Sequence, residues 1–177
     1  YVSFEVRLRL EFRREVSRLT GLYIHIPFCL KKCGYCDFVS FTNQYDKIET
    51  YINAVCREMQ EYRDVEVDTI YFGGGTPTSI ENRYILKLMD EISHTFKVAP
   101  DSEITVECNP KTANLEYLKQ MRAGGINRLS IGIQSLKDEE LNFLGRLHDA
   151  EDARNSVYLA REAGFDNLNL DVMFGFP

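Results

Sequence analysis

Short apolar runs alternate with longer amphipathic segments along the chain from residue 20 onward. Five of the runs are rich in β-branched and aromatic residues and are predicted to be strands: 22–27, 68–72, 103–108, 128–135 and 167–174. The segments between them are predicted to be helices: 46–62, 79–97, 114–123, 138–147 and 150–163. Strands that alternate with helices indicate right-handed β/α units around a parallel sheet, so the predicted fold class is α/β.

Local signals mark where the helices begin and end. An apolar stripe at three- and four-residue spacing identifies the first helix: Ile48, Ile52, Val55, Met59 and Tyr62. Thr78, with Glu81 three residues later, is predicted to cap the second helix. Gly124-Gly125 and Gly164 are predicted to end the third and the fifth. Five β/α units are too few for a closed barrel of eight, which needs roughly 250 residues, so we expect a sheet with an open side.

Four of the five strands alternate apolar residues with polar or small ones. The polar or small positions are Tyr23 and His25; Thr105, Glu107 and Asn109; Ser130, Gly132 and Gln134; and Asn167, Asn169 and Asp171. If the apolar positions pack under the helices, these side chains face the other side of the sheet. Carboxylates and amides at the carboxyl ends of parallel strands are typical of a ligand cavity. The same pattern also fits a half-exposed sheet with one face in water.

Charge and composition narrow the class of protein. The 177 residues include 21 Lys and Arg against 27 Asp and Glu, a formal net charge of −6, which argues against nucleic acid as a partner. The hydrophobic share of 44% is enough for a globular core, and no apolar run approaches the ~18 residues of a transmembrane segment. Five cysteines without a secretory signal favour a cytoplasmic protein with reduced thiols. A sequence that starts at Tyr and stops at Phe-Gly-Phe-Pro is expected to be part of a longer protein.

A C-x3-C-x2-C loop follows the first predicted strand, and its cysteines are Cys29, Cys33 and Cys36. Gly34 is expected to provide the tight bend that three close thiols require. Three soft ligands with the fourth position open suit a [4Fe–4S] cluster, while zinc would take Asp37 or His25 as a fourth ligand. Three ordinary reduced cysteines are the third interpretation. Cys56 and Cys108 fall on apolar positions and are predicted to be core residues.

A glycine-rich turn, Gly73-Gly74-Gly75-Thr76, ends the second predicted strand. Three glycines leave the backbone uncovered, so a ligand is expected to approach the amides closely. A purely structural tight turn gives the same pattern. The position of the turn at the same sheet edge as the cysteine loop favours the functional interpretation.

Residues 1–20 form an N-terminal extension of unknown role. Apolar and polar residues alternate strictly over 2–12, which is typical of an amphipathic strand. An extra edge strand, an upstream translation artefact and a helix that continues into 14–19 all fit this segment.

Five motifs stand in order along the rest of the chain: Leu22-Tyr-Ile-His-Ile-Pro-Phe-Cys29, Gly73-Gly-Gly-Thr-Pro77, Val106-Glu-Cys-Asn-Pro110, Arg128-Leu-Ser-Ile-Gly-Ile-Gln134 and Asp171-Val-Met-Phe-Gly-Phe-Pro177. Together they resemble the radical SAM (S-adenosylmethionine) family, and within it the oxygen-independent coproporphyrinogen III oxidases and related haem chaperones. The resemblance implies a partial (β/α)6-type barrel. Residues 21–177 would then be its core domain, incomplete because the sixth strand and the C-terminal part are missing.

The resemblance also implies cofactors and their ligands. Cys29, Cys33 and Cys36 would ligate a [4Fe–4S] cluster whose fourth iron chelates SAM. The positions that match SAM contacts are Tyr23, Gly74, Gly75, Thr76, Glu107, Gln134, Arg146 and Asp171, and Tyr35 matches an aromatic position near the adenine or a second SAM. In the family, one electron from the cluster cleaves SAM and releases a 5′-deoxyadenosyl radical. By spacing alone, Arg146 is expected to be an exposed helix arginine.

One departure from the motif favours a branch. The coproporphyrinogen-oxidising members carry a fourth cysteine two residues after the third, where this chain has Phe38. The Cys36-Asp-Phe38 ending resembles the haem chaperones, as does Arg146-Leu-His148, although His148 is itself expected to be a surface helical histidine. The resemblance thus implies a protein that binds haem and delivers it to an acceptor protein. The alternatives are a coproporphyrinogen III oxidase (dehydrogenase) that acts on a tetrapyrrole, and a metal-stabilised binding module without SAM chemistry.

Overall fold

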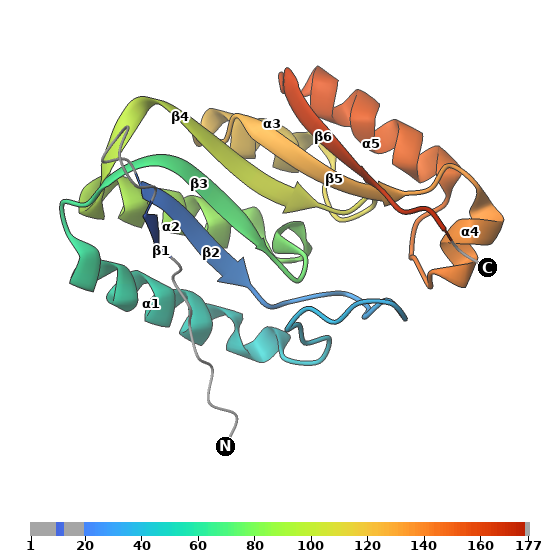
Figure 1. Cartoon of the computed structure of the whole chain (residues 1–177), viewed down its shortest axis with the longest axis horizontal. Coiled ribbons are helices and arrows are strands. Elements are labelled where there is room, and N and C mark those ends of the chain that lie inside the picture. Colours follow the sequence, from blue (N-terminus) through green and yellow to red (C-terminus); the bar gives the residue numbers. More distant parts are fainter. Residues whose placement is uncertain (1–9, 13–19, 176–177) are drawn as a thin grey trace.

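The computed structural model describes residues 10–12 and 20–175, and it contains one sheet with the strand order β1-β2-β3-β4-β5-β6 (Figure 1). The strands are β1 (Leu10–Phe12), β2 (Thr20–Ile26), β3 (Glu66–Gly74), β4 (Lys97–Cys108), β5 (Arg128–Gln134) and β6 (Asn167–Val172). The strands from β2 to β6 are all parallel, whereas β1 is antiparallel to β2. The predicted open sheet of five parallel β/α units is therefore confirmed.

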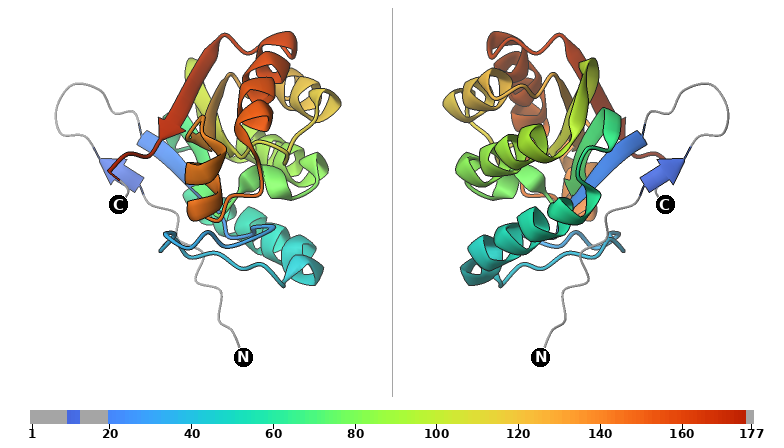
Figure 2. Two further views of the ribbon diagram at one scale, coloured as in Figure 1. Left: turned by 90° about the vertical axis from the view of Figure 1, so that its right-hand side faces the viewer. Right: turned by 90° about the vertical axis from the view of Figure 1, so that its left-hand side faces the viewer.

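The helices lie on one side of this sheet. They are α1 (Ile48–Met59), α2 (Asn82–Thr95), α3 (Leu115–Ala123), α4 (Asp138–Phe143) and α5 (Ala150–Glu162), with short 3-10 turns at Tyr45–Lys47, Gln60–Tyr62 and Pro77–Ser79. Figure 2 shows α1, α2, α3 and α5 against one face of a curved sheet. The apolar positions of the strands, such as Ile24, Phe72 and Leu129, are buried under them. Among the described residues, no helix is both long and apolar enough to cross a membrane.

Among the helix boundaries that differ from the sequence prediction, two have a clear local cause. Thr78 does not cap α2, because Pro77 starts a 3-10 turn there and the Thr78 hydroxyl bonds to that of Thr112 at 2.5 Å. The predicted helix 138–147 ends at Phe143, because Gly145 takes a left-handed conformation with φ of 71°. The glycine ends of α3 and α5 are confirmed, with positive φ at Gly125 and Gly164.

The two edges of the sheet differ. At one edge, Leu10–Phe12 pairs with β2, which confirms the edge-strand interpretation for these three residues, while 1–9 and 13–19 lie outside the described residues. At the other edge, no described strand pairs with the outer side of β6, and Leu170 and Val172 are 42% and 60% exposed. The N-terminal strand therefore does not cover β6. We therefore expect 167–177 to be the segment least protected from hydrogen exchange; its last two residues lie outside the described part.

Asn127 joins β4 to β5 in a way that the sequence patterns did not indicate. Its Oδ1 accepts a hydrogen bond from the Ile104 N–H at 2.8 Å, and its Nδ2 donates to the Ser102 carbonyl at 2.7 Å. Because β5 begins only at Arg128, this side chain extends the ladder on β4 by the length of one residue. Asn127 thus pairs backbone groups of β4 at the point along the chain just ahead of the first residue pair between β4 and β5.

We expect Asn127→Ala to lower the free energy of unfolding by about 1–3 kcal/mol, because it leaves an N–H and a carbonyl of β4 unpaired. Urea unfolding of the variant and the parent measures this. The control is Asn167→Ala, which removes an exposed amide whose one contact to Glu103 is 3.3 Å long, and should change stability by less than about 0.5 kcal/mol. Equal losses in the two variants would contradict the role given to Asn127.

Candidate functional site

A cavity of about 450 Å³ opens on the concave face of the sheet, at the carboxyl ends of the parallel strands. This volume lies within the ~300–1,000 Å³ typical of sites for small molecules and cofactors. Eight of the nine residues expected to contact SAM line it: Tyr35, Gly74, Gly75, Thr76, Glu107, Gln134, Arg146 and Asp171. The polar positions of the strands thus form a cavity, as the alternation predicts.

Glu107 is the most enclosed carboxylate of the cavity. Its Oε1 accepts a hydrogen bond from the Tyr71 hydroxyl at 2.9 Å, and its Oε2 accepts one from the Gly74 N–H at 3.1 Å. Burial raises the pKa of Glu107, and the nearby charge of Asp171 raises it further, while the two hydrogen bonds oppose this shift. The carboxylate is therefore fixed in position and available to a cationic or hydroxyl-bearing ligand.

Tyr23, the ninth predicted contact, does not line the cavity itself. Its ring stacks on Tyr71 with the centroids 6.0 Å apart, and its hydroxyl lies 3.2 Å from His25 Nδ1. Burial and the charge of Glu107 raise the pKa of Tyr23 to about 12, and the same causes raise the pKa of Tyr71. Both phenols therefore stay protonated at neutral pH, and Tyr23 supports the tyrosine that holds Glu107.

Asp171 and Gln134 form the opposite wall of the cavity. The carboxylate of Asp171 accepts hydrogen bonds from the Ser130 hydroxyl at 3.3 Å and from Asn169 Nδ2 at 2.6 Å. Gln134 ends β5 with φ of 61°, a left-handed conformation that is uncommon for a residue with a side chain. Its carbonyl accepts a hydrogen bond from Met173 N–H, which ties the end of β6 to β5.

The glycine turn lies in the cavity wall, but its amides are already bonded within the protein. The N–H of Gly74 donates to Glu107, that of Gly75 to the Ile26 carbonyl at 2.9 Å, and that of Thr76 to the Phe28 carbonyl at 2.8 Å. The expectation that these amides are open to a ligand is therefore wrong. The glycines are required for packing, because a Cβ on Gly74 would lie 2.5 Å from the His25 ring and one on Gly75 2.8 Å from the Phe28 carbonyl.

The cysteine loop returns to the residues that directly follow β2 and is anchored there at both ends. Cys29 N–H donates to the Phe41 carbonyl at 3.0 Å, and Phe41 N–H donates to the Pro27 carbonyl at 2.7 Å. Cys36 N–H donates to the Cys33 carbonyl at 3.1 Å, which closes the predicted turn. Gly34 sits in this turn without a positive φ and with no atom within 4 Å of a Cβ placed on it, so the bend does not require glycine.

The three thiols have different surroundings. Cys36 lines the large cavity, Cys33 lines a smaller adjoining one of about 40 Å³, and the buried Cys29 has its Sγ 3.4 Å from the Thr76 hydroxyl. Across the described residues, no three ligand side chains converge on a point where one metal ion could sit. A [4Fe–4S] cluster would bind each of the three thiolates at a different iron.

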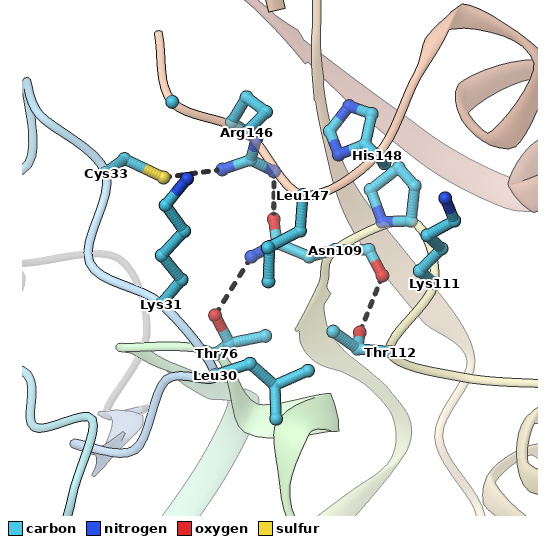
Figure 3. Close-up of a pocket in the computed structure, with 12 residues that line it drawn as sticks. Leu30, Lys31, Cys33, Thr76, Asn109, Lys111, Thr112, Arg146, Leu147 and His148 are labelled. Atoms are coloured by element: carbon cyan, nitrogen blue, oxygen red, sulfur yellow. Dashed lines mark hydrogen bonds between the residues drawn. The ribbon is translucent and has the colours of Figure 1, made fainter. Parts of the chain in front are cut away.

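Arg146 is the side chain that connects the loop to the sheet. The expectation of an exposed helix arginine is wrong, because α4 ends before it and the guanidinium turns inward (Figure 3). Its Nη1 donates to Cys33 Sγ at 3.5 Å and to the Tyr35 hydroxyl at 3.3 Å, and its Nη2 donates to Asn109 Oδ1 at 2.5 Å and to the Gly132 carbonyl at 2.7 Å. A positive charge thus lies against the Cys33 sulfur.

His148 is also not the surface helical histidine that was expected. It is 4% exposed, precedes α5 instead of lying on it, and its Nε2 lies 3.0 Å from the Ile133 carbonyl. Burial lowers the pKa of His148, so the neutral ring donates this bond. Arg146 and His148 together hold their loop to consecutive carbonyls of β5.

Several residues of the site were not predicted from the sequence. Tyr71 was missed because the alternation on its strand was not recognised, although its register pairing with Tyr23 and Thr105 puts it in the same row. Asn109 and Ser130 lay on the correct face of their strands, but nothing in the pattern linked them to the other groups of the site. Phe38 was read only as the replacement of a cysteine, whereas its ring lines the cavity.

Curated relatives include the haem chaperone HemW of Bacillus subtilis (strain 168), which is 43% identical over 164 residues, covering 90% of this chain and 43% of the relative. The haem chaperone HemW of Escherichia coli (strain K12) is 37% identical and covers 89% of this chain and 43% of the relative. The chain thus spans less than half the length of these relatives.

Solved structures also resemble this one. Coproporphyrinogen III oxidase (HemN) from Escherichia coli, described as a radical SAM enzyme, superposes with a TM-score of 0.80 at 34% identity, over 88% of this chain and 37% of that one. The FeFe-hydrogenase maturase HydG from Carboxydothermus hydrogenoformans shares the fold, with a TM-score of 0.60 at 18% identity over 89% of this chain and 37% of that one.

A family model agrees with the motifs and the geometry. The model of the radical SAM superfamily matches residues 23–177, which include the cysteine loop, the glycine turn and every side chain that we have placed around the cavity. The chain belongs to the radical SAM superfamily, and this membership implies a [4Fe–4S] cluster and SAM as its cofactors.

Proposed function

We propose that Cys29, Cys33 and Cys36 bind the [4Fe–4S] cluster and that the cavity beside them binds SAM. The proposal rests on one observation above the others: the cysteine loop and the polar ends of β3 to β6 meet around a single cavity. Arg146 partly offsets the negative charge that thiolates would bring, because its guanidinium already donates to Cys33. When bound, the cluster would supply the electron that cleaves SAM.

The cavity side chains divide into acceptors and donors for such a ligand. Glu107 and Asp171 accept hydrogen bonds from an ammonium group or from ribose hydroxyls, and each is held in place by a neighbouring hydroxyl. Arg146 supplies positive charge for a carboxylate at the side nearest the thiols. The exposed ring of Tyr35 lies at the rim, where it offers a face to a base.

We also propose that the whole protein binds haem and delivers it to an acceptor protein, as the name of its HemW relatives describes. Identities of 33–43% to these haem chaperones support this. So does Phe38, which lines the cavity at the position where the coproporphyrinogen-oxidising members have a fourth cysteine. The alternative is a coproporphyrinogen III oxidase, which the TM-score of 0.80 to HemN favours.

Two further assignments complete the proposal. We take residues 21–177 as the radical SAM core, in agreement with the family match over 23–177, and residues 1–20 as an extension outside it. We take the location to be cytoplasmic, because none of the five cysteines forms a disulfide, which is typical of a reducing compartment.

The first test concerns the cluster ligands. Anaerobic reconstitution should give about four irons per chain, and Ala at any one of Cys29, Cys33 or Cys36 should abolish the cluster. Iron and labile-sulfide analysis measures this. The controls are Cys56→Ala and Cys108→Ala, which should keep the cluster because both thiols are buried in the core and burial raises their pKa values. Loss of the cluster in Cys108→Ala alone, or stoichiometric zinc without sulfide, would contradict the proposal.

The second test concerns SAM. We expect Glu107→Ala to weaken SAM binding to the cluster-loaded protein by about 1–3 kcal/mol, the range for a lost partner of a charged group. Calorimetric titration gives the affinity. The matched control is Glu103→Ala, because Glu103 is an exposed carboxylate of the same strand that does not line the cavity. The assignment is wrong if both variants bind SAM as the parent does.

The third test separates the two branches. The whole protein should bind haem, which a shift of the haem absorption band on titration would show. It should not decarboxylate coproporphyrinogen III under reducing conditions with SAM. Product analysis by mass spectrometry is the readout for the second reaction. Turnover of coproporphyrinogen III with no haem binding would favour the oxidase instead.

A further inference from the structure

Three side chains form the wall between the large cavity and the small one: Thr76, Asn109 and Arg146 line both (Figure 3). Thr76 and Arg146 are already proposed to contact SAM, but Asn109 has no part in that proposal. It follows the last residue of β4, and its backbone carbonyl accepts bonds from the Thr112 N–H at 3.1 Å and the Thr112 hydroxyl at 2.6 Å. The side chain therefore stands on a fixed base.

The direction of the hydrogen bonds through this wall follows from Arg146. A guanidinium can only donate, so the Asn109 atom that it meets at 2.5 Å must be the carbonyl Oδ1. The amide Nδ2 of Asn109 is then the atom that faces Thr76 Oγ1, and it donates there at 2.9 Å. Because the Thr76 oxygen accepts this bond, its own proton remains free for another acceptor.

The chain of bonds reaches two cysteine sulfurs. Cys29 Sγ lies 3.4 Å from Thr76 Oγ1. A cluster-binding Cys29 is a thiolate that can only accept, so the free hydroxyl proton of Thr76 is then donated to the sulfur. At the other end, Arg146 Nη1 donates to Cys33 Sγ at 3.5 Å. One guanidinium thus starts two paths, a direct one to Cys33 and one through Asn109 and Thr76 to Cys29.

We propose that Asn109 is a positioning residue that gives this chain its direction, so that Cys29 and Cys33 each receive one hydrogen bond. The inference rests on the proposed function, in which both sulfurs are cluster ligands. The amide carries a separate acceptor for Arg146 and a separate donor for Thr76 on one short side chain. An Asp at this position would accept hydrogen bonds from both Arg146 and Thr76. The Thr76 hydroxyl would then donate to the Asp, and Cys29 would have no donor.

The consequence lies in the reduction potential of the cluster. Hydrogen bonds to the sulfur ligands favour the more negatively charged, reduced cluster and therefore raise its potential. Loss of the donor to Cys29 should lower the equilibrium constant for reduction by about three- to tenfold. A tenfold change corresponds to about 59 mV for a one-electron couple.

The experiment measures the midpoint potential of the reconstituted full chain without SAM, by redox titration followed by electron paramagnetic resonance. The variants are Asn109→Ala, which removes both amide bonds, Thr76→Val, which removes the donor to Cys29 and keeps the shape, and the two together. Each should have a more negative potential than the parent. Because both substitutions break one path, the double variant should shift by less than the sum of the single shifts.

The control is Thr105→Val, which makes the same chemical change on β4 at a residue that lines neither the small nor the large cavity. It should leave the potential unchanged, and thermal unfolding of every variant reports any effect on the fold. If Asn109→Ala fails to hold a cluster, Thr76→Val carries the same test, because it removes the same hydrogen bond.

Unchanged or more positive potentials in Asn109→Ala and Thr76→Val would overturn the inference, as would fully additive shifts in the double variant. These results differ from a failure of the proposed function. In that case the parent chain itself would assemble no cluster or bind no SAM, and no potential would exist to compare.

Discussion

Successive side chains of a β-strand point to opposite faces of the sheet, and the part of this site that the sheet contributes depends on that alternation. The apolar positions of β2 to β5 are buried under the helices, which leaves the other face to the polar positions. The parallel register then aligns these positions in rows across the sheet, such as Glu107, Ser130 and Asn169. A carboxylate, a hydroxyl and an amide from three strands thus lie side by side although they are far apart in the sequence.

Two loops contribute the remaining side chains of the site. The cysteine loop is anchored at Pro27 and Cys29, just after β2, and brings Cys36 to the wall of the cavity. The loop after α4 brings Arg146, whose guanidinium bonds to Cys33 and Tyr35 on one side and to Asn109 and Gly132 on the other. One charged group therefore links the cysteine loop to β5 and to the residue that follows β4.

The glycine turn has a different physical role from the one that its composition first indicates. Its three amides are bonded to Glu107, Ile26 and Phe28, so the turn fixes the carboxylate and the start of the cysteine loop from inside the protein. Close packing of His25 and the Phe28 carbonyl is what excludes a larger residue. The polar groups of the cavity wall are already ordered before a ligand binds. This order lowers the entropic cost of binding.

The sequence by itself determined the five β/α units, the face on which the polar side chains lie and the membership of a family, because periodicity and motif spacing are properties of the chain. Only the tertiary structure decided which of those side chains meet. Arg146 and His148 could not be placed from spacing, since Gly145 ends the helix early and turns both inward. Asn109 and Tyr71 gained their partners from neighbouring strands and loops, over 33 to 37 positions of sequence, and no local pattern encodes a contact at that distance.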